Sequence, residues 1–346
     1  MSLENQTMRQ SENQNGGNWR ILGQFVMALV CTILPFANLH GEKKIPEVAI
    51  IQGASGEEAY EKKFARWAEN FRNACVYADR TVRNIHKVDR NITPREQIRS
   101  WLQLLETTPK QPIWIFLIGH GTYDGKSAKF NLIGPDLSAE DLKNWLKPHK
   151  DRSVLIINMA SSSAPFVSKL SSPNHIILSA TRSGSEYNST QLANFLSKNI
   201  INPEADLDQD GQTSLLEAWL YSTRELADHY KQDGRLQTEH SILDDNADGK
   251  GTQPKAFVGI LPKDTSEESK IPDGFRAHQH HLKQSDFEKS LSVEQRKLRD
   301  DLEHQIHQLR RKKSILTEEE YYQKLEELLR KLGQIYFPKT KDAEEE

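Results

Sequence analysis

The stretch of sequence that decides the fold is Ile113-Trp-Ile-Phe-Leu-Ile118, which is followed by Gly119-His120-Gly121. Six consecutive apolar residues are typical of a strand that is buried on both of its faces. We therefore expect this run to be a buried strand of a sheet. Further runs on either side have the composition of strands: residues 47–52, 81–88, 153–158, 175–179 and 256–260.

Helical patterns lie between these runs. Apolar residues recur at every third or fourth position from Tyr60 to Cys75, which places them on one face of a helix. Residues 93–96 and 138–141 each place a hydroxyl residue three positions before an acidic one, a capping signature that predicts the start of a helix. Strands alternating with helices predict an α/β fold with a mostly parallel sheet flanked by helices, which places functional loops at the carboxyl ends of the strands.

Composition limits the classes of function. The chain has 346 residues and a formal net charge of −3, with 36% hydrophobic and 27% charged residues. No basic block stands out, so nucleic acid is not an expected partner. The two cysteines, Cys31 and Cys75, cannot build a disulfide framework.

Residues 1–41 resemble a targeting segment. A polar lead ends at Arg20, and the apolar run at 21–36 is shorter than a bilayer span. The segment fits a cleaved signal peptide or an uncleaved membrane anchor. We therefore expect the protein to be exported, to the periplasm or the extracellular space, or to be membrane-anchored, with membrane contact through this segment alone.

The stretch Asp206-Leu-Asp-Gln-Asp-Gly-Gln-Thr-Ser-Leu-Leu-Glu217 matches the pattern D-x-D-x-D-G-x-x-x-x-x-E of an EF-hand calcium loop. Calcium is a hard cation that takes six to eight oxygen ligands, and acidic residues at alternate positions supply them. The alternative interpretation is an acidic turn that caps the following helix. A lone loop favours a structural ion over a sensor, because sensors open paired helices. The predicted ligands are Asp206, Asp208, Asp210, Gln212 through its backbone carbonyl, Ser214 directly or through water, and Glu217 with both oxygens.

A second stretch, Asp244-Asp-Asn-Ala-Asp-Gly249, begins in the same way. Its twelfth position is Lys255, which cannot bind a cation. A solvated turn is the favoured interpretation, and the alternative is that the stretch lends an oxygen to a shared ion.

The C-terminal third has a different character. Residues 263–290 are polar and are interpreted as a linker. The histidines at 278, 280 and 281 could bind a metal, but solvated residues of the linker are the favoured interpretation. Two capped amphipathic helices follow within 292–337 and predict a helical hairpin of the coiled-coil type, whose apolar stripes pack on each other, on the main domain or on a second chain. The inner faces are expected to hold Leu298, Leu302, Ile306 and Leu309, and then Tyr322, Leu325, Leu329 and Leu332. Residues 338–346 form an acidic tail.

Two strand ends resemble those of a known peptidase clan. The run that ends at Gly119-His120-Gly121 is similar to the histidine strand of the caspase and legumain clan of cysteine peptidases. Residues 155–162 look like the clan's nucleophile strand, and 181–186 are similar to the pocket-forming loop of legumain-type enzymes. The resemblance implies a caspase-like domain over 46–262, with His120 as the base and a substrate pocket formed by Arg182, Ser183 and Glu186.

The position that matches the clan's nucleophilic cysteine is Ala160. A methyl group cannot attack a carbonyl, so the clan's thiolate mechanism is lost. Ser161, or a neighbouring serine, is the alternative nucleophile with His120 as its base. Each of these features also has a purely structural interpretation. His120 would then be a hydrogen-bonded loop residue, the serines a polar turn that caps the next helix, and Arg182 and Glu186 an ion pair within their loop.

These features predict a catalytically inactive, peptidase-like protein that binds calcium and an unidentified peptide or protein partner. Two alternatives stay open. One is an active hydrolase that uses Ser161 with His120. The other is a structural assembly protein that associates through its helical hairpin.

Overall fold

The computed structural model describes residues 45–108, 111–263 and 272–337. The predicted targeting segment at 1–41 and the predicted acidic tail at 338–346 lie outside these residues. The chain divides into two units, and all described residues belong to the second, Lys44–Glu346.

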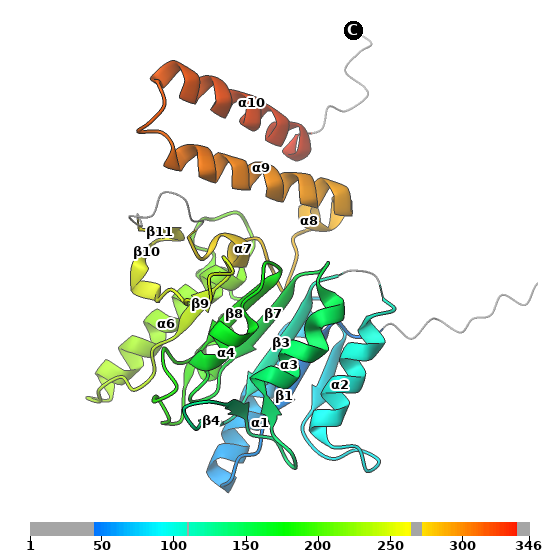
Figure 1. Cartoon of the computed structure of the whole chain (residues 1–346). Helices are drawn as coiled ribbons and strands as arrows, with labels where there is room; N and C mark the ends of the chain where they lie inside the picture. Colours follow the sequence, from blue (N-terminus) through cyan, green and yellow to red (C-terminus); the bar gives the residue numbers. More distant parts are fainter. Residues whose placement is uncertain (1–44, 109–110, 264–271, 338–346) are drawn as a thin grey trace, which may run out of the picture. The chain divides into compact units, whose positions relative to one another are not determined.

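In the described part of the chain, a six-stranded sheet has the order β2-β1-β3-β7-β8-β9 (Figure 1). Neighbouring strands from β2 to β8 run parallel, and β9 pairs with β8 in the antiparallel direction. Every residue of β3 is buried, as its unbroken apolar run predicts. The α/β fold with a mostly parallel sheet is confirmed. The strands are β1 (Val48–Gln52), β2 (Val82–Ile85), β3 (Ile113–Ile118), β7 (Val154–Asn158), β8 (His175–Ser179) and β9 (Ile242–Asp244).

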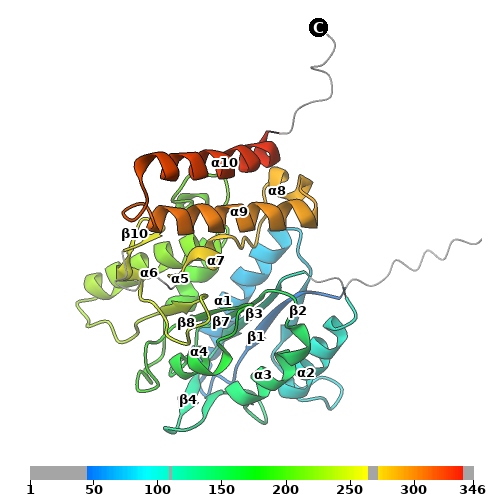
Figure 2. The same cartoon turned by 45° about the horizontal axis from the view of Figure 1, so that its top comes forward.

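Helices cover both faces of this sheet (Figure 2). Successive side chains of β3 alternate between the two faces: Trp114 and Phe116 pack into one apolar core, and Ile113 and Ile115 into the other. The first core is closed by α1 (Glu58–Tyr77), α5 (Leu192–Asn199) and α6 (Leu215–Gln232), and the second by α2 (Pro94–Leu105), α3 (Ala139–Leu146) and α4 (Ala164–Leu170).

The predicted capping signatures are confirmed. Thr93 caps α2 and Ser138 caps α3. In each case the side chain of the acidic residue three positions later accepts a hydrogen bond from the backbone nitrogen of the capping residue. A small sheet of β4 (Gly121–Tyr123), β5 (Ala128–Phe130) and β6 (Leu137–Ser138) follows β3. Single-turn helices occur at η1 (Lys147–His149), η2 (Pro203–Ala205) and η3 (Pro254–Ala256).

The strand expected at 256–260 does not join the main sheet. Residues 257–258 form β10 (Phe257–Val258), which pairs only with β11 (Leu261–Pro262) among the described strands. The sheet ends instead at β9, which is too short to stand out in the sequence. Two backbone hydrogen bonds between Leu243 and Thr252 hold β9 against the chain that follows it.

The interpretation of 263–290 as a solvated linker is wrong for residues 272–290. They contain α7 (Phe275–His278) and α8 (Asp286–Ser290), and they bury Asp273, Ala277 and Leu282. Polar composition misleads here because the polar groups have partners. Asp273, for example, accepts hydrogen bonds from the backbone nitrogens of Asp245 and Asn246.

The predicted helical hairpin is present as α9 (Val293–Arg311) and α10 (Glu318–Tyr336), and both helices begin with capping boxes. In α9 the buried apolar residues are Leu302, Ile306 and Leu309, whereas Leu298 is exposed. In α10 the inner face is shifted from the predicted one: Tyr321 and Ile335 are buried, and Tyr322 and Leu329 are exposed. None of the helices in the described ranges combines the length and the hydropathy needed to cross a bilayer.

Candidate functional site

The predicted calcium loop connects η2 to α6. Two of its residues have positive φ angles, Gln209 at 61° and Gly211 at 86°. This backbone turns the chain sharply, and at the second position glycine carries no steric penalty. Amides inside the turn hold the first carboxylate: Asp206 Oδ1 accepts from Asp210 N at 3.2 Å, and Oδ2 accepts from Gly211 N at 3.0 Å.

Three carboxylates converge inside this turn. Asp206, Asp208 and Asp210 each offer an oxygen, and these oxygens all lie within 4.8 Å of one another. Burial raises the pKa of Asp210, and the charges of Asp208, Glu217 and Asp206 raise it further. Like charges held this close by the backbone create a site whose electrostatic cost a bound cation would offset.

Glu217 occupies the closing position of the loop and is fully buried. Its Oε2 accepts from Ser214 N at 2.9 Å and from Ser214 Oγ at 2.8 Å, which forms the capping box of α6. Its Oε1 accepts from the backbone nitrogens of Leu207 and Asp208 at 2.8 and 3.2 Å. The carboxylate therefore faces the loop while backbone donors hold it.

Ser214 and Gln212, two further predicted ligand positions, hold the loop in place through hydrogen bonds. The Ser214 hydroxyl is engaged with Glu217, so its role in this structure is that of an N-cap. The Gln212 side chain accepts from Ser285 N at 2.8 Å, which ties the loop to the segment before α8. These contacts place the predicted ligand positions in one turn, with Ser214 at its helical end.

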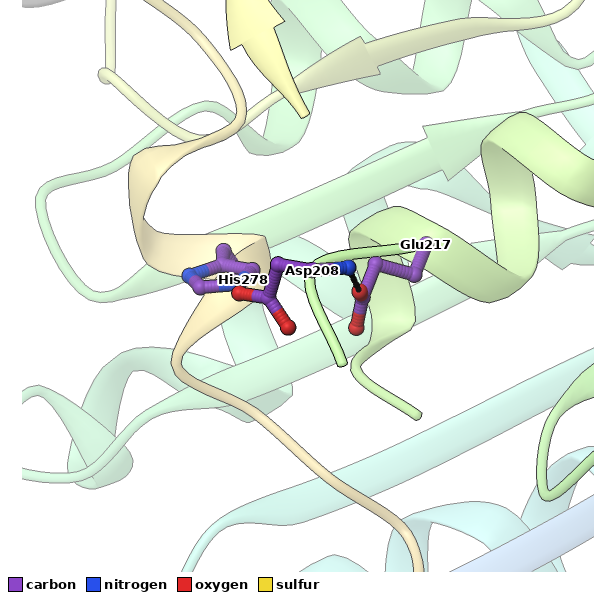
Figure 3. Close-up of side chains that lie close together, drawn as sticks. All are labelled: Asp208, Glu217 and His278. Atoms are coloured by element: carbon purple, nitrogen blue, oxygen red, sulfur yellow. Dashed lines mark hydrogen bonds and ion pairs between the residues drawn. The ribbon is translucent and has the colours of Figure 1, made fainter. Parts of the chain in front are cut away.

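A histidine that the sequence did not assign to the site lies beside these acids. His278 Nε2 is 3.0 Å from Asp208 Oδ2, and atoms of Asp208, Glu217 and His278 lie within 4.8 Å of one another (Figure 3). Burial lowers the pKa of His278, but the hydrogen bond and charge of Asp208 outweigh it, and the net shift is upward. The pattern His278-Gln-His-His was the available signal, but 70 residues separate it from Asp208, so local sequence could not connect the two.

The loop after β3 places His120 against aromatic rings. The ring centroid of His120 lies 4.7 Å from that of Tyr60 and 5.1 Å from that of Phe64, both in edge-to-face geometry. Burial lowers the pKa of His120, so the neutral imidazole is favoured. A neutral imidazole is the form that a general base requires.

The loop after β7 is closed to solvent. Ala160, Ser161, Ser162 and Ser163 are each at most 3% exposed. Ser161 Oγ accepts from Gly121 N and donates to Gly121 O, both at 3.2 Å. No side chain fits at Gly121, because a Cβ there would lie 2.4 Å from Ser161 O.

The other serines of this loop are also held in place. Ser163 Oγ lies 2.8 Å from Ser179 Oγ and 3.2 Å from Thr181 Oγ1. Ser162 has a φ of 52°, an uncommon conformation for a residue other than glycine, and its amide donates to Glu186 O at 2.8 Å. Within the described hydrogen bonds, therefore, the hydroxyls of Ser161 and Ser163 bond to groups other than His120.

In the predicted pocket loop, Arg182 and Glu186 form the ion pair of the structural interpretation. Glu186 Oε1 lies 3.2 Å from Arg182 Nε and 2.7 Å from His240 Nδ1. Ser183 Oγ lies 2.8 Å from Ser185 Oγ. This network pairs Arg182 with Glu186, so the guanidinium is not a free cation for binding a substrate.

A hollow of about 360 Å³ is lined in part by Tyr60, the residue whose ring also contacts His120. It contains the two cationic side chains Lys63 and Arg235, and within the described residues the buried hydroxyl of Ser189 has no hydrogen-bond partner. The lining residues are Tyr60, Lys63, Asn188, Ser189, Gln191, Arg235 and Thr238.

Comparison with known proteins leaves these sites to be interpreted on their own chemistry. No protein-family model matches the chain, and no curated protein matches its sequence.

Proposed function

We propose that this chain is a calcium-binding protein with a caspase- and legumain-like domain that has no peptidase activity and binds a peptide or protein partner. The observation that carries the proposal is the loop of Asp206, Asp208 and Asp210, whose carboxylate oxygens lie within 4.8 Å of one another. The loop ends at Glu217, which is buried and directed to the same turn.

Calcium is the ion that the donor set favours. Three carboxylates from alternate positions of one turn supply hard oxygen ligands, and a fourth follows at the twelfth position. The set of Asp208, Glu217 and His278 contains one nitrogen, which suits zinc better. Calcium and zinc are therefore the two ions that an experiment must compare.

Calorimetric titration of the full chain after EDTA treatment tests the first part of the proposal. We expect saturable calcium binding in the range of about 10⁻⁷ to 10⁻³ M that is typical of such loops, and its loss in Asp208→Asn. Asp228→Asn removes the same charge from an exposed position of α6 and should bind as the wild type does. Tighter binding of zinc than of calcium, or equal loss in both variants, would contradict the proposal.

The absence of peptidase activity follows from the loop after β7. Ala160 offers no nucleophile, and the Ser161 hydroxyl is bonded to the backbone of Gly121. We expect no cleavage of a mixed peptide library and no labelling by a serine-reactive probe. Labelling that disappears in both Ser161→Ala and His120→Ala would instead establish a serine hydrolase.

The partner surface proposed here is the hollow lined by Tyr60, Lys63 and Arg235. Lys63 and Arg235 give it positive charge, so an acidic peptide segment fits it best. We expect an acidic peptide selected from a library to bind the wild type and to bind Lys63→Ala at least about tenfold more weakly. Lys62→Ala, whose side chain is 75% exposed and outside the hollow, is the matched control. Selected peptides without acidic residues would refute this choice of surface.

Assembly through the hairpin is a second candidate, favoured by one observation. Leu298, Tyr322 and Leu329 are exposed apolar residues on α9 and α10. If they bury against a second copy, light scattering should give the mass of a dimer for the full chain, and a triple substitution of these residues with Glu should give the monomer. A monomer in both cases would remove this candidate.

A further inference from the structure

Residues 244–249 share two positive φ angles with residues 206–211, the first half of the calcium loop. The fourth residue of each stretch has a positive φ, 66° at Ala247 and 61° at Gln209. The sixth residue is a glycine with a positive φ, 72° at Gly249 and 86° at Gly211. Similarity of backbone alone does not indicate a ligand.

The internal hydrogen bonds repeat as well. In the second stretch, Asn246 Oδ1 accepts from Asp248 N at 2.9 Å, and Asp248 Oδ1 accepts from Lys250 N at 2.8 Å. In the first stretch, the same two positions accept from the same two relative positions, at 3.2 and 2.8 Å. Both stretches therefore present oxygens at their first, third and fifth positions.

Asp244 supplies the observation that points to a ligand. Its side chain is 1% exposed, and neither carboxylate oxygen has a hydrogen bond of ordinary geometry among the described residues. The Ser171 hydroxyl and the amides of Ala247 and Gly249 lie near the carboxylate without completing such bonds. A buried carboxylate that lacks well-formed hydrogen bonds is unfavourable, and a cation is the partner that would offset this cost. The expectation of a solvated turn is therefore wrong for Asp244.

A second buried oxygen lies beside this stretch. Ser171, the C-cap of α4, has a buried hydroxyl that lies near the Asp244 carboxylate and forms no hydrogen bond of ordinary geometry among the described residues. A Cβ built on Gly249 would lie 4.0 Å from Ser171 Oγ, which shows how closely the two segments approach. The hydroxyl therefore stands next to the turn that Asp244 begins.

The surroundings are rich in carboxyl groups. Asp245 and Asp273 are buried near Asp244, and their oxygens accept from backbone nitrogens, Asp245 from Gly274 and Ala277 and Asp273 from Asp245. Arg276 is the cation that faces the cluster, but its guanidinium donates to the backbone oxygens of Pro173, His175 and Asp245. No described salt bridge reaches Asp244.

We propose that residues 244–248 form a second site for a hard divalent cation, with calcium as the expected ion. The Asp244 carboxylate, the Asn246 side-chain oxygen and the Asp248 carboxylate bind it, and the Ser171 hydroxyl contributes from α4. The site is distinct from the Asp206–Glu217 loop and does not depend on it. Because Lys255 replaces the closing acid, the second site is the weaker of the two.

Such an ion would join segments that are far apart in the sequence. The stretch follows directly from β9 at the edge of the main sheet, and Ser171 ends the helix that precedes β8. The ion would hold this edge of the sheet against α4.

The experiment counts calcium ions on the full chain by native mass spectrometry and calorimetric titration after EDTA treatment. We expect two ions on the wild type, one on Asp244→Asn, one on Asp208→Asn and none on the double variant. Asp228→Asn is the matched control and should keep both ions. A single ion that survives Asp244→Asn and is lost in Asp208→Asn overturns the second site and leaves the first. A single ion with the opposite behaviour supports the second site and overturns the first.

Thermal melting separates a ligand from a structural residue. In EDTA, Asp244→Asn should melt at or above the temperature of the wild type, because the change removes a buried carboxylate charge and keeps the size of the side chain. In calcium, its melting temperature should rise by less than that of the wild type. Asp248→Asn alters an exposed residue and keeps the side-chain oxygen that accepts from Lys250 N, and it should weaken binding of the second ion by about tenfold or more. Unchanged calcium affinity in both variants would overturn the proposal.

Discussion

At the scale of single residues, buried carboxylates dominate the chemistry of this protein. Glu217 is at once the N3 residue of a capping box and the predicted closing ligand of the calcium loop. Glu239 is a second buried carboxylate with several donors. Its oxygens accept from the amides of Gln191 and Leu192 at the start of α5, and from the Tyr230 hydroxyl. Each carboxylate replaces lost hydration with several donors.

Glu239 leads to a prediction about pH. Burial raises the pKa of Glu239 from 4.5 to about 7. The folded state therefore binds this proton more tightly than the unfolded state, and the contribution of Glu239 to the free energy of unfolding falls as pH rises from about 4.5 to about 7. Over this window we expect the wild type to lose up to about 3 kcal/mol of stability relative to Glu239→Gln.

Urea unfolding of both proteins between about pH 5 and about pH 8 measures this difference. The control is Glu58→Gln, whose acidic side chain is 81% exposed and should show no such trend. Parallel stability curves for the wild type and Glu239→Gln would contradict the prediction.

At the scale of elements, a buried ion pair joins the hairpin to α8. Arg299 of α9 pairs with Glu288 of α8, and both side chains are less than 10% exposed. Asp300 also accepts from Arg299, at 2.7 Å. Breaking a buried pair leaves a charge without compensation, which costs far more than breaking a pair at the surface.

We therefore predict that Arg299→Ala destabilises the hairpin by about 3 kcal/mol. Hydrogen exchange should become faster in α8 and α9, while the strands of the main sheet keep their protection. Arg330→Ala breaks an exposed pair with Glu326 on α10 and serves as the control, with an expected effect under about 1 kcal/mol. Equal exchange in the two variants would show that the buried pair does not stabilise the hairpin.

The hairpin also shows which features of an element can be predicted. Both helices start where their capping signatures predict, because a cap depends on residues three positions apart. The inner face of α10 is shifted because the sequence offers neighbouring apolar candidates: Tyr321 and Tyr322, and Leu328 and Leu329. Contact with α8 and α9 selects one of each pair, as the packing of Leu328 against Leu291 and Leu302 shows.

At the scale of the whole molecule, the Asp206–Glu217 loop is tied to the segment after residue 272. Gln212 accepts from Ser285 N, His278 contacts Asp208, and the amide of Leu215 donates to His280 O. An ion in the loop would stabilise these contacts, because it fixes the backbone from which they start.

Chelation should therefore act beyond the loop itself. We predict that EDTA lowers the melting temperature and that hydrogen exchange becomes faster in residues 275–290 as well as in 206–217. Magnesium added back in excess should restore less stability than calcium, because it prefers a stricter octahedral geometry. An unchanged melting temperature on adding EDTA would refute a structural role for the ion.

The sequence by itself determined the features that depend on neighbouring residues. The apolar run at 113–118 predicted a buried strand, and the capping signatures predicted helix starts. The pattern at 206–217 predicted a turn that gathers carboxylates, because its ligands and its glycine lie in one short segment. Local spacing carries all of this information.

Only the tertiary structure decided which distant residues meet. It brought His278 to Asp208, packed residues 272–290 instead of leaving them solvated, and buried the Asp244 carboxylate. The physical reason is that burial and pairing depend on the neighbours that folding supplies, and composition does not reveal them. Two stretches with nearly the same sequence pattern, 206–211 and 244–249, therefore have different surroundings, and these surroundings identify the second as a candidate site.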